Sequence, residues 1–112
     1  NAYGPTENTV CATMHLYNPC QSSNTIGKPI SNVTCYVLDK YLKPVTVGAP
    51  GYLYLGGSGV ARGYFNRDKI NREKFIKNPL KKRARSRTII SLSNNNKFIA
   101  YKNIFRRTSR CW

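Results

Sequence analysis

Glycine is so frequent in the middle of this chain that only short helices or strands fit there. Six of the eight glycines lie between residues 48 and 63, and prolines stand at positions 44 and 50. Both residue types weaken helices and long strands. We therefore predict a loop over 43–51 and a tight turn over 56–67, where two stretches of backbone approach closely.

Short apolar segments on either side of this region have the patterns of strands. In segment 33–39, Val33, Cys35 and Val37 share one face, and the other face is also apolar, which predicts a strand covered on both sides. Segment 52–57 is predicted to be a short strand that ends in glycines. Segment 9–17 is rich in β-branched and small apolar residues, which predicts a buried strand.

One segment has the pattern of a helix. Residues 66–76 carry apolar side chains at Ile70, Phe75 and Ile76 with charges between them, and Asn66 is placed to cap the start. Together these elements predict a mixed α/β, β-rich fold. The length of 112 residues allows one domain at most.

Positive charge is concentrated at one end of the chain. The net charge is +15, and residues 78–112 carry ten Lys or Arg and no acidic residue. Aromatic residues at Tyr101, Phe105 and Trp112 are interspersed there, so this tail could bind RNA or single strands through phosphates and stacking. The alternative is a solvated basic tail without such a role.

Other classes of function find little support. The four cysteines show no Cys-x-x-Cys pair, and His15 has no Cys or carboxylate at ligand spacing, so no zinc site is predicted. No apolar run is long enough to span a membrane, and no signal peptide opens the chain. We therefore expect reduced thiols and a cytoplasmic location.

The first seven residues, Asn-Ala-Tyr-Gly-Pro-Thr-Glu, combine a stiff turn with polar chemistry. Gly4 and Pro5 fix the bend, and Thr6 and Glu7 follow it. The ring of Tyr3 could stack on a base, the hydroxyl could bind a phosphate and the carboxylate could hold Mg²⁺. An ordinary proline turn with polar surface residues is the alternative.

Two stretches together indicate a family. Residues 1–7, and residues 26–79 with their Gly-Tyr-Leu-Tyr-Leu-Gly-Gly-Ser-Gly-Val-Ala-Arg-Gly-Tyr run, resemble the adenylation domains of nonribosomal peptide synthetases, within the AMP-forming ligase superfamily. The two motifs occur in the family's order and spacing. The resemblance implies a piece of that domain's large subdomain, including part of its distorted β-barrel, and it makes the glycine-rich run mainly architectural.

The resemblance also implies an activity. Such domains activate an amino acid with ATP to give aminoacyl-AMP, and then load it onto the phosphopantetheine thiol of a carrier protein. By motif, the nucleotide would be contacted by Asn1, Tyr3, Gly4, Thr6 and Glu7, with Glu7 also holding Mg²⁺. The substrate pocket would be lined in part by Ala2, Val10 and Cys11.

The resemblance divides the chain in two. Residues 1–79 are expected to be a partial adenylation domain, and residues 80–112 a basic tail outside the family pattern, either disordered or read out of frame. The family's upstream phosphate loop, its Tyr-Arg-Thr-Gly-Asp motif and its catalytic lysine do not occur. We therefore expect no catalytic residue here, no activity from the chain alone, and partnerless apolar positions at Val33, Cys35 and Val37. The open alternative is a small basic nucleic-acid-binding protein that acts through its tail.

Overall fold

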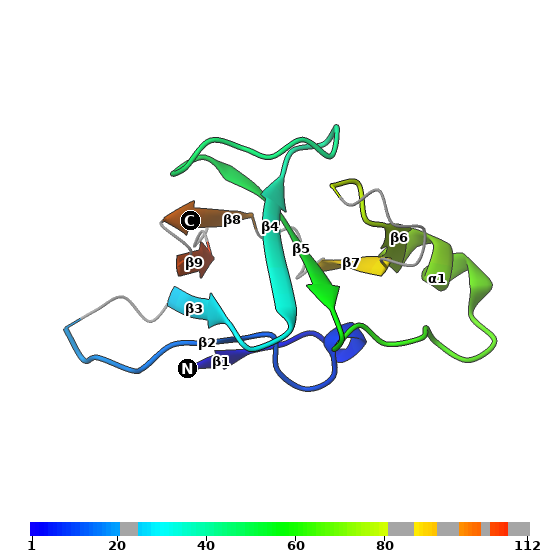
Figure 1. Cartoon of the computed structure of the whole chain (residues 1–112), viewed down its shortest axis with the longest axis horizontal. Coiled ribbons are helices and arrows are strands. Elements are labelled where there is room, and N and C mark those ends of the chain that lie inside the picture. The colour runs from blue at the N-terminus through cyan, green and yellow to red at the C-terminus, as the bar shows by residue number, and fades with distance from the viewer. Residues whose placement is uncertain (21–24, 81–86, 92–96, 102–103, 108–112) are drawn as a thin grey trace, which may run out of the picture.

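The structure is a computed structural model that describes residues 1–20, 25–80, 87–91, 97–101 and 104–107. In this part of the chain the elements are, in order, β1 (Ala2–Tyr3), the 3-10 helix η1 (Thr6–Asn8), β2 (Thr13–Met14), β3 (Thr25–Pro29), β4 (Val33–Leu38), β5 (Pro50–Gly57), α1 (Asp68–Lys74), β6 (Phe75–Lys77), β7 (Arg87–Ser91), β8 (Phe98–Tyr101) and β9 (Ile104–Arg107). The predicted mixed, β-rich class is confirmed (Figure 1).

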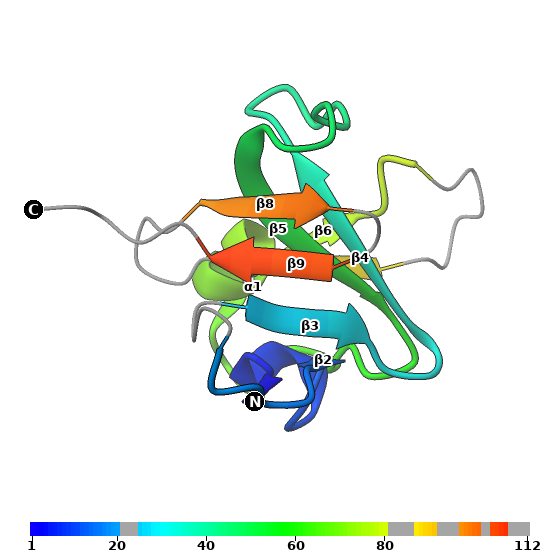
Figure 2. The same cartoon turned by 90° about the vertical axis from the view of Figure 1, so that its left-hand side faces the viewer.

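Strand β5 organises the sheet. Its residues 52–57 pair with β4, in an antiparallel register that runs from Val33 opposite Gly57 to Leu38 opposite Tyr52. Pro50 and Gly51 pair with β8, whereas residues 53–56 also pair with β7. The strands β3, β9 and β8 form a layer that crosses the β4–β5 hairpin, as Figure 2 shows.

The core lies between these layers. The buried apolar residues that form one cluster are Ala12, Ile26, Val37, Leu53, Leu55, Phe98 and Phe105. Full burial of a side chain such as Leu or Phe contributes about 1.5–3 kcal/mol. Because β8 and β9 supply Phe98 and Phe105, residues beyond position 80 help to close the same core as β4 and β5.

The strand predictions for 33–39 and 52–57 are confirmed by β4 and β5. The expectation that Val33, Cys35 and Val37 would lack partners is wrong. Val37 is buried in the core cluster, and Val33 and Cys35 pack against it. The layer formed by β3, β9 and β8 supplies Ile26, Phe105 and Phe98 to the same cluster, in line with the prediction that this strand is covered.

The prediction of a buried strand over 9–17 is wrong. Only Thr13–Met14 forms a strand, and Val10 and Leu16 are 89% and 91% exposed. The reason lies in the backbone, since Thr9 and Val10 have φ angles of 42° and 64°. Two successive residues in this left-handed region turn the chain and prevent an extended strand.

The helix predicted over 66–76 exists but is shorter. It spans Asp68–Lys74, none of its residues is buried, and Phe75 and Ile76 belong to β6. Asn66 does not cap it: Arg67 holds the N-cap position without a side-chain hydrogen bond, and Asn66 has a φ of 51°. Asn tolerates that left-handed conformation well, which accounts for its place in the turn.

The tail beyond residue 80 is described in part. Strand β7 contains the adjacent apolar residues Ile89 and Ile90, and β8 has the sequence Phe-Ile-Ala-Tyr. The division of the chain at residue 79, and the disorder or altered frame expected for 80–112, stay predictions. Trp112 lies outside the described residues, and no described helix is long and apolar enough to cross a membrane.

Candidate functional site

The opening residues form a stiff turn. Tyr3 pairs with Thr13, Pro5 then changes the direction of the chain, and η1 follows with a hydrogen bond of 2.9 Å from the Asn8 amide to the Pro5 carbonyl. Gly4 is required here, because a Cβ at this position would lie 2.3 Å from the carbonyl oxygen of Val10.

The residues expected to contact a nucleotide lie on different sides of this turn. Thr6 is exposed, Glu7 is buried, and the half-buried ring of Tyr3 packs on Phe98 with 5.7 Å between centroids. Asn1 is tied into the sheet, since its side chain donates to the Thr25 carbonyl at 2.6 Å. Tyr3 therefore has a packing role in the core besides the predicted stacking role.

The glycine-rich turn docks against η1. The Ala61 amide donates to the Glu7 carbonyl at 2.8 Å, and the Thr9 hydroxyl donates to the Gly59 carbonyl, also at 2.8 Å. Asn8 is fully buried beneath this contact, and a Cβ on Gly59 would come within 3.2 Å of the Asn8 Oδ1 atom. The structure thus brings together the two motifs that the sequence separates by some fifty residues.

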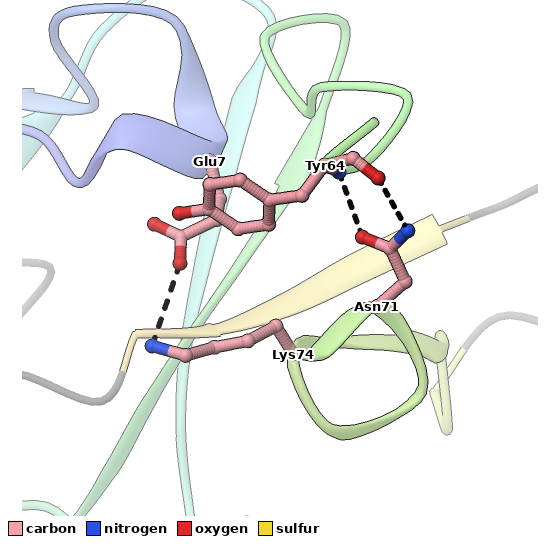
Figure 3. Close-up of polar contacts among 4 residues, drawn as sticks. All are labelled: Glu7, Tyr64, Asn71 and Lys74. Carbon is pink, nitrogen blue, oxygen red and sulfur yellow. Dashed lines mark hydrogen bonds and ion pairs between the residues drawn. The ribbon is translucent and has the colours of Figure 1, made fainter. Parts of the chain in front are cut away.

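The Glu7 side chain points toward α1 and meets a cation there. Its Oε1 atom lies 3.4 Å from the Nζ atom of Lys74, the last residue of the helix (Figure 3). A buried carboxylate requires such a partner, because an unpaired charge in this environment is costly.

A second residue of α1 holds the backbone of Tyr64, whose side chain lies beside Glu7. The Tyr64 amide donates to Asn71 Oδ1 at 2.7 Å, and Asn71 Nδ2 donates to the Tyr64 carbonyl at 2.8 Å (Figure 3). Desolvation, followed by a hydrogen bond to the Glu7 carboxylate and its negative charge, raises the pKa of the Tyr64 phenol. The phenol therefore remains protonated and able to donate.

The expected substrate-pocket residues face different surroundings. Ala2 and Val10 are exposed, whereas Cys11 is half-buried and its thiol donates to the Thr13 carbonyl at 3.3 Å. Their role in a pocket stays a prediction. Cys11, Cys20 and Cys35 are free thiols, and burial raises the pKa of Cys35 to about 12.

The described residues include no group of three or more His, Cys, Asp or Glu side chains that could hold a metal ion together. The Glu7 carboxylate is nevertheless the type of oxygen ligand that Mg²⁺ prefers. Magnesium ordinarily keeps several waters and binds through one or two carboxylates together with substrate phosphates.

Three residues at this site, Tyr64, Asn71 and Lys74, were not predicted from the sequence. Asn71 and Lys74 are three positions apart and so share a helix face, which a sequence can indicate. Their partners Tyr64 and Glu7 depend on how the glycine-rich turn folds back.

Comparisons with known proteins agree with the two motifs. A family model described as AMP-binding enzyme matches residues 1–65. The chain is 57% identical over 79 residues to a linear gramicidin synthase of Brevibacillus parabrevis, and 52% identical over 79 residues to bacitracin synthase 3 of Bacillus licheniformis. Each alignment covers 70% of this chain and 1% of the synthase.

Solved structures show the same fold. One is a holo NRPS protein containing adenylation and PCP domains bound to a vinylsulfonamide inhibitor, with a TM-score of 0.80 and 26% identity. Another is a four-domain nonribosomal peptide synthetase bound to AMP and glycine, with a TM-score of 0.81 and 27% identity. Each match covers 99% of this chain, but only 20% and 8% of those chains.

The relatives and the solved structures give no support to the alternative of a nucleic-acid-binding protein. The chain spans a small part of every protein just described, and the part it spans has the fold of an adenylation domain. Since the family model matches more than half of its residues, the chain belongs to the AMP-binding enzyme family.

Proposed function

We propose that the chain is part of a nonribosomal peptide synthetase adenylation domain, and that the whole protein activates an amino acid with ATP. The carboxylate oxygen of the amino acid attacks the α-phosphorus, the bond to the pyrophosphate leaving group breaks, and aminoacyl-AMP forms. The aminoacyl group then passes to the phosphopantetheine thiol of a carrier protein, and AMP leaves. The curated relatives are peptide synthases, which supports this class of reaction.

The docking of the glycine-rich turn on η1 is the observation that carries the proposal. Its two hydrogen bonds, from Ala61 to Glu7 and from Thr9 to Gly59, hold the opening motif rigid. A rigid donor set loses little entropy when it binds a charged ligand. The exposed Thr6 hydroxyl is open to solvent-borne phosphate groups.

Within this function the residues have distinct roles. Tyr3 would stack on adenine, Asn1 would lie at the adenine edge, Gly4 would allow close approach and Thr6 would bind the α-phosphate. Glu7 would hold Mg²⁺, which when bound supplies positive charge to the phosphates. Ala2, Val10 and Cys11 would line part of the amino-acid pocket.

The partners follow from the same function. They are the amino-acid substrate, the remainder of the adenylation domain and a carrier protein, all in the cytoplasm. One of the solved neighbours contains PCP domains beside its adenylation domain, which supports a carrier partner. We propose no partnership with membranes or nucleic acid.

The chain alone is expected to bind nucleotide weakly and to catalyse nothing. Activation needs donors placed around all the phosphates, and this sequence contains the turn at Thr6 and Glu7 without a phosphate loop. Amino-acid-dependent ATP–pyrophosphate exchange by the 112-residue chain should therefore be at background. Exchange above background would contradict this part of the proposal.

Nucleotide binding tests the site itself. In saturation-transfer NMR with ATP, the adenine protons should receive more saturation than the ribose protons, because Tyr3 is expected to stack on the base. Thr6→Val removes one charge-assisted hydrogen bond at an exposed position and should weaken binding about tenfold. The control is Thr46→Val, the same change at another exposed position in the loop before β5. Equal affinities for the two variants would refute the proposed role of Thr6.

A further inference from the structure

The Glu7 carboxylate is already paired with a positively charged side chain. Lys74 Nζ lies 3.4 Å from Glu7 Oε1, and the two side chains are 27% and 8% exposed. The pair joins η1 to the end of α1. Ion pairs between fully exposed side chains contribute little to stability. This carboxylate is buried, so its negative charge depends on Lys74 to offset the loss of hydration.

The helix that carries Lys74 is anchored to the same site by Asn71. The Asn71 side chain accepts a hydrogen bond from the Tyr64 amide at 2.7 Å and donates one to the Tyr64 carbonyl at 2.8 Å. It lies three residues before Lys74 on the helix. Figure 3 shows the Tyr64 ring beside the Glu7 carboxylate, with Lys74 reaching the same carboxylate from below. The position of Lys74 on the helix is therefore fixed relative to Tyr64, and its ammonium group lies on the Glu7 carboxylate.

A divalent cation bound to Glu7 would lie within a few ångströms of this ammonium group. Two like charges at such a distance repel each other strongly where solvent screening is limited. The carboxylate can therefore satisfy Lys74 or a bare metal ion, but holding both is unfavourable.

We propose that Lys74 is a resident counter-ion of Glu7, which a divalent cation must displace to reach the carboxylate. The proposal rests on the proposed function in one respect, since it takes Glu7 as the metal carboxylate. A metal ion alone then binds poorly. A metal ion that arrives with nucleotide phosphates binds better, because the phosphates offer the released ammonium group a new anionic partner.

The test uses Mn²⁺ alone as the probe and the full 112-residue chain. Affinity is measured from the relaxation of water protons by bound Mn²⁺, in the absence of nucleotide. Lys74→Met removes the competing charge and should tighten Mn²⁺ binding about fivefold or more. Lys69→Met removes the same charge from an exposed position on the same helix and should leave the affinity unchanged.

Further variants identify the carboxylate. Lys74→Arg keeps the charge and should bind Mn²⁺ as the unmodified chain does. Combining Glu7→Gln with Lys74→Met should abolish the gain. If Lys74→Met loses the native circular dichroism spectrum, Lys74→Gln, which keeps a hydrogen-bond donor, takes its place with the same expected direction.

The proposal is overturned if removing the Lys74 charge leaves Mn²⁺ affinity unchanged or weakens it, or if Lys69→Met produces the same gain. If the Glu7–Lys74 ion pair served only to hold η1 against α1, removing the Lys74 charge would leave Mn²⁺ affinity unchanged or weaken it. Because no nucleotide is present, failure here leaves the ATP experiment above unaffected, and failure of ATP binding leaves this result intact.

Discussion

Segment 1–65 and the strand pair β8–β9 pack on the same core, yet they differ in what their sequences specify. The first matches the AMP-binding family and carries both of its motifs. The second lies outside that match, although the structural likeness to adenylation domains extends over 99% of the chain. In β8, Phe98 is buried and Ala100, two residues on, packs against the core.

This difference in sequence shows that closing a sheet and building a ligand site place different demands on the residues. Closing a sheet needs apolar residues at a period of two and a free strand edge to pair with, and many sequences meet that condition. Building a ligand site needs particular residues at particular places, such as the turn that presents Thr6 and Glu7. Strands β8 and β9 meet the first requirement with Phe98 and Phe105.

The largest expected effect tests whether β8 belongs to the core as fully as β5 does. Phe98 and Leu53 are both completely buried. Phe98→Ala should lower the free energy of unfolding by about 3–5 kcal/mol, and Leu53→Ala by about 2–5 kcal/mol. Urea denaturation followed by circular dichroism measures both. An unchanged midpoint for Phe98→Ala would show that β8 does not contribute to the core.

The next effect compares two glycines of one turn. Gly57 has a φ of 112°, and a Cβ there would lie 2.0 Å from the Asn32 carbonyl oxygen, whereas at Gly59 the nearest atom is a side-chain oxygen of Asn8 at 3.2 Å. Gly57→Ala should therefore destabilise the fold by about 2 kcal/mol or more, and Gly59→Ala by about 1 kcal/mol or less. Thermal unfolding of the two variants ranks them. The reverse order would mean that the turn is built differently.

A smaller effect concerns the contact between α1 and the glycine-rich turn. Asn71→Ala removes two hydrogen bonds to the Tyr64 backbone and should cost about 1–3 kcal/mol. Asn71→Asp keeps the acceptor for the Tyr64 amide and loses only the donor, so it should cost less. Denaturation midpoints measure both changes, and equal losses would argue against the paired geometry.

The smallest effect compares two thiols. Burial raises the pKa of Cys35 to about 12, whereas Cys20 is exposed. At pH 8, iodoacetamide should alkylate Cys20 at least about tenfold faster than Cys35, as measured by mass spectrometry of digested samples. Equal rates would show that the layer over β4 does not shield Cys35.

The same thiol gives a pH dependence of stability. Above pH of about 8.5, where an unfolded cysteine ionises, the unfolded chain loses a proton that the folded Cys35 keeps. The contribution of this group to the free energy of unfolding should therefore fall as the pH rises toward 12. Cys35→Ala should remove that part of the decline.

Local patterns predicted the parts of the fold that depend on local chemistry. The alternation of Val33, Cys35 and Val37 located β4, and the glycines located the end of β5. The segment 9–17 was mispredicted because positive φ angles at Thr9 and Val10 override its β-branched composition. The pairing of Glu7 with Lys74 depends on tertiary contacts, which neither spacing nor composition encodes.

The sequence separation of the paired strands also constrains the order in which the chain can fold. The β4–β5 hairpin closes a short loop and can form early, whereas β3 must wait for β9, with Thr25 opposite Arg106. During synthesis from the N-terminus, one edge of β3 and one edge of β5 therefore stay unpaired until β7, β8 and β9 have left the ribosome. In that interval the nascent chain exposes these edges to other copies, and a chaperone that binds extended apolar segments would protect it then.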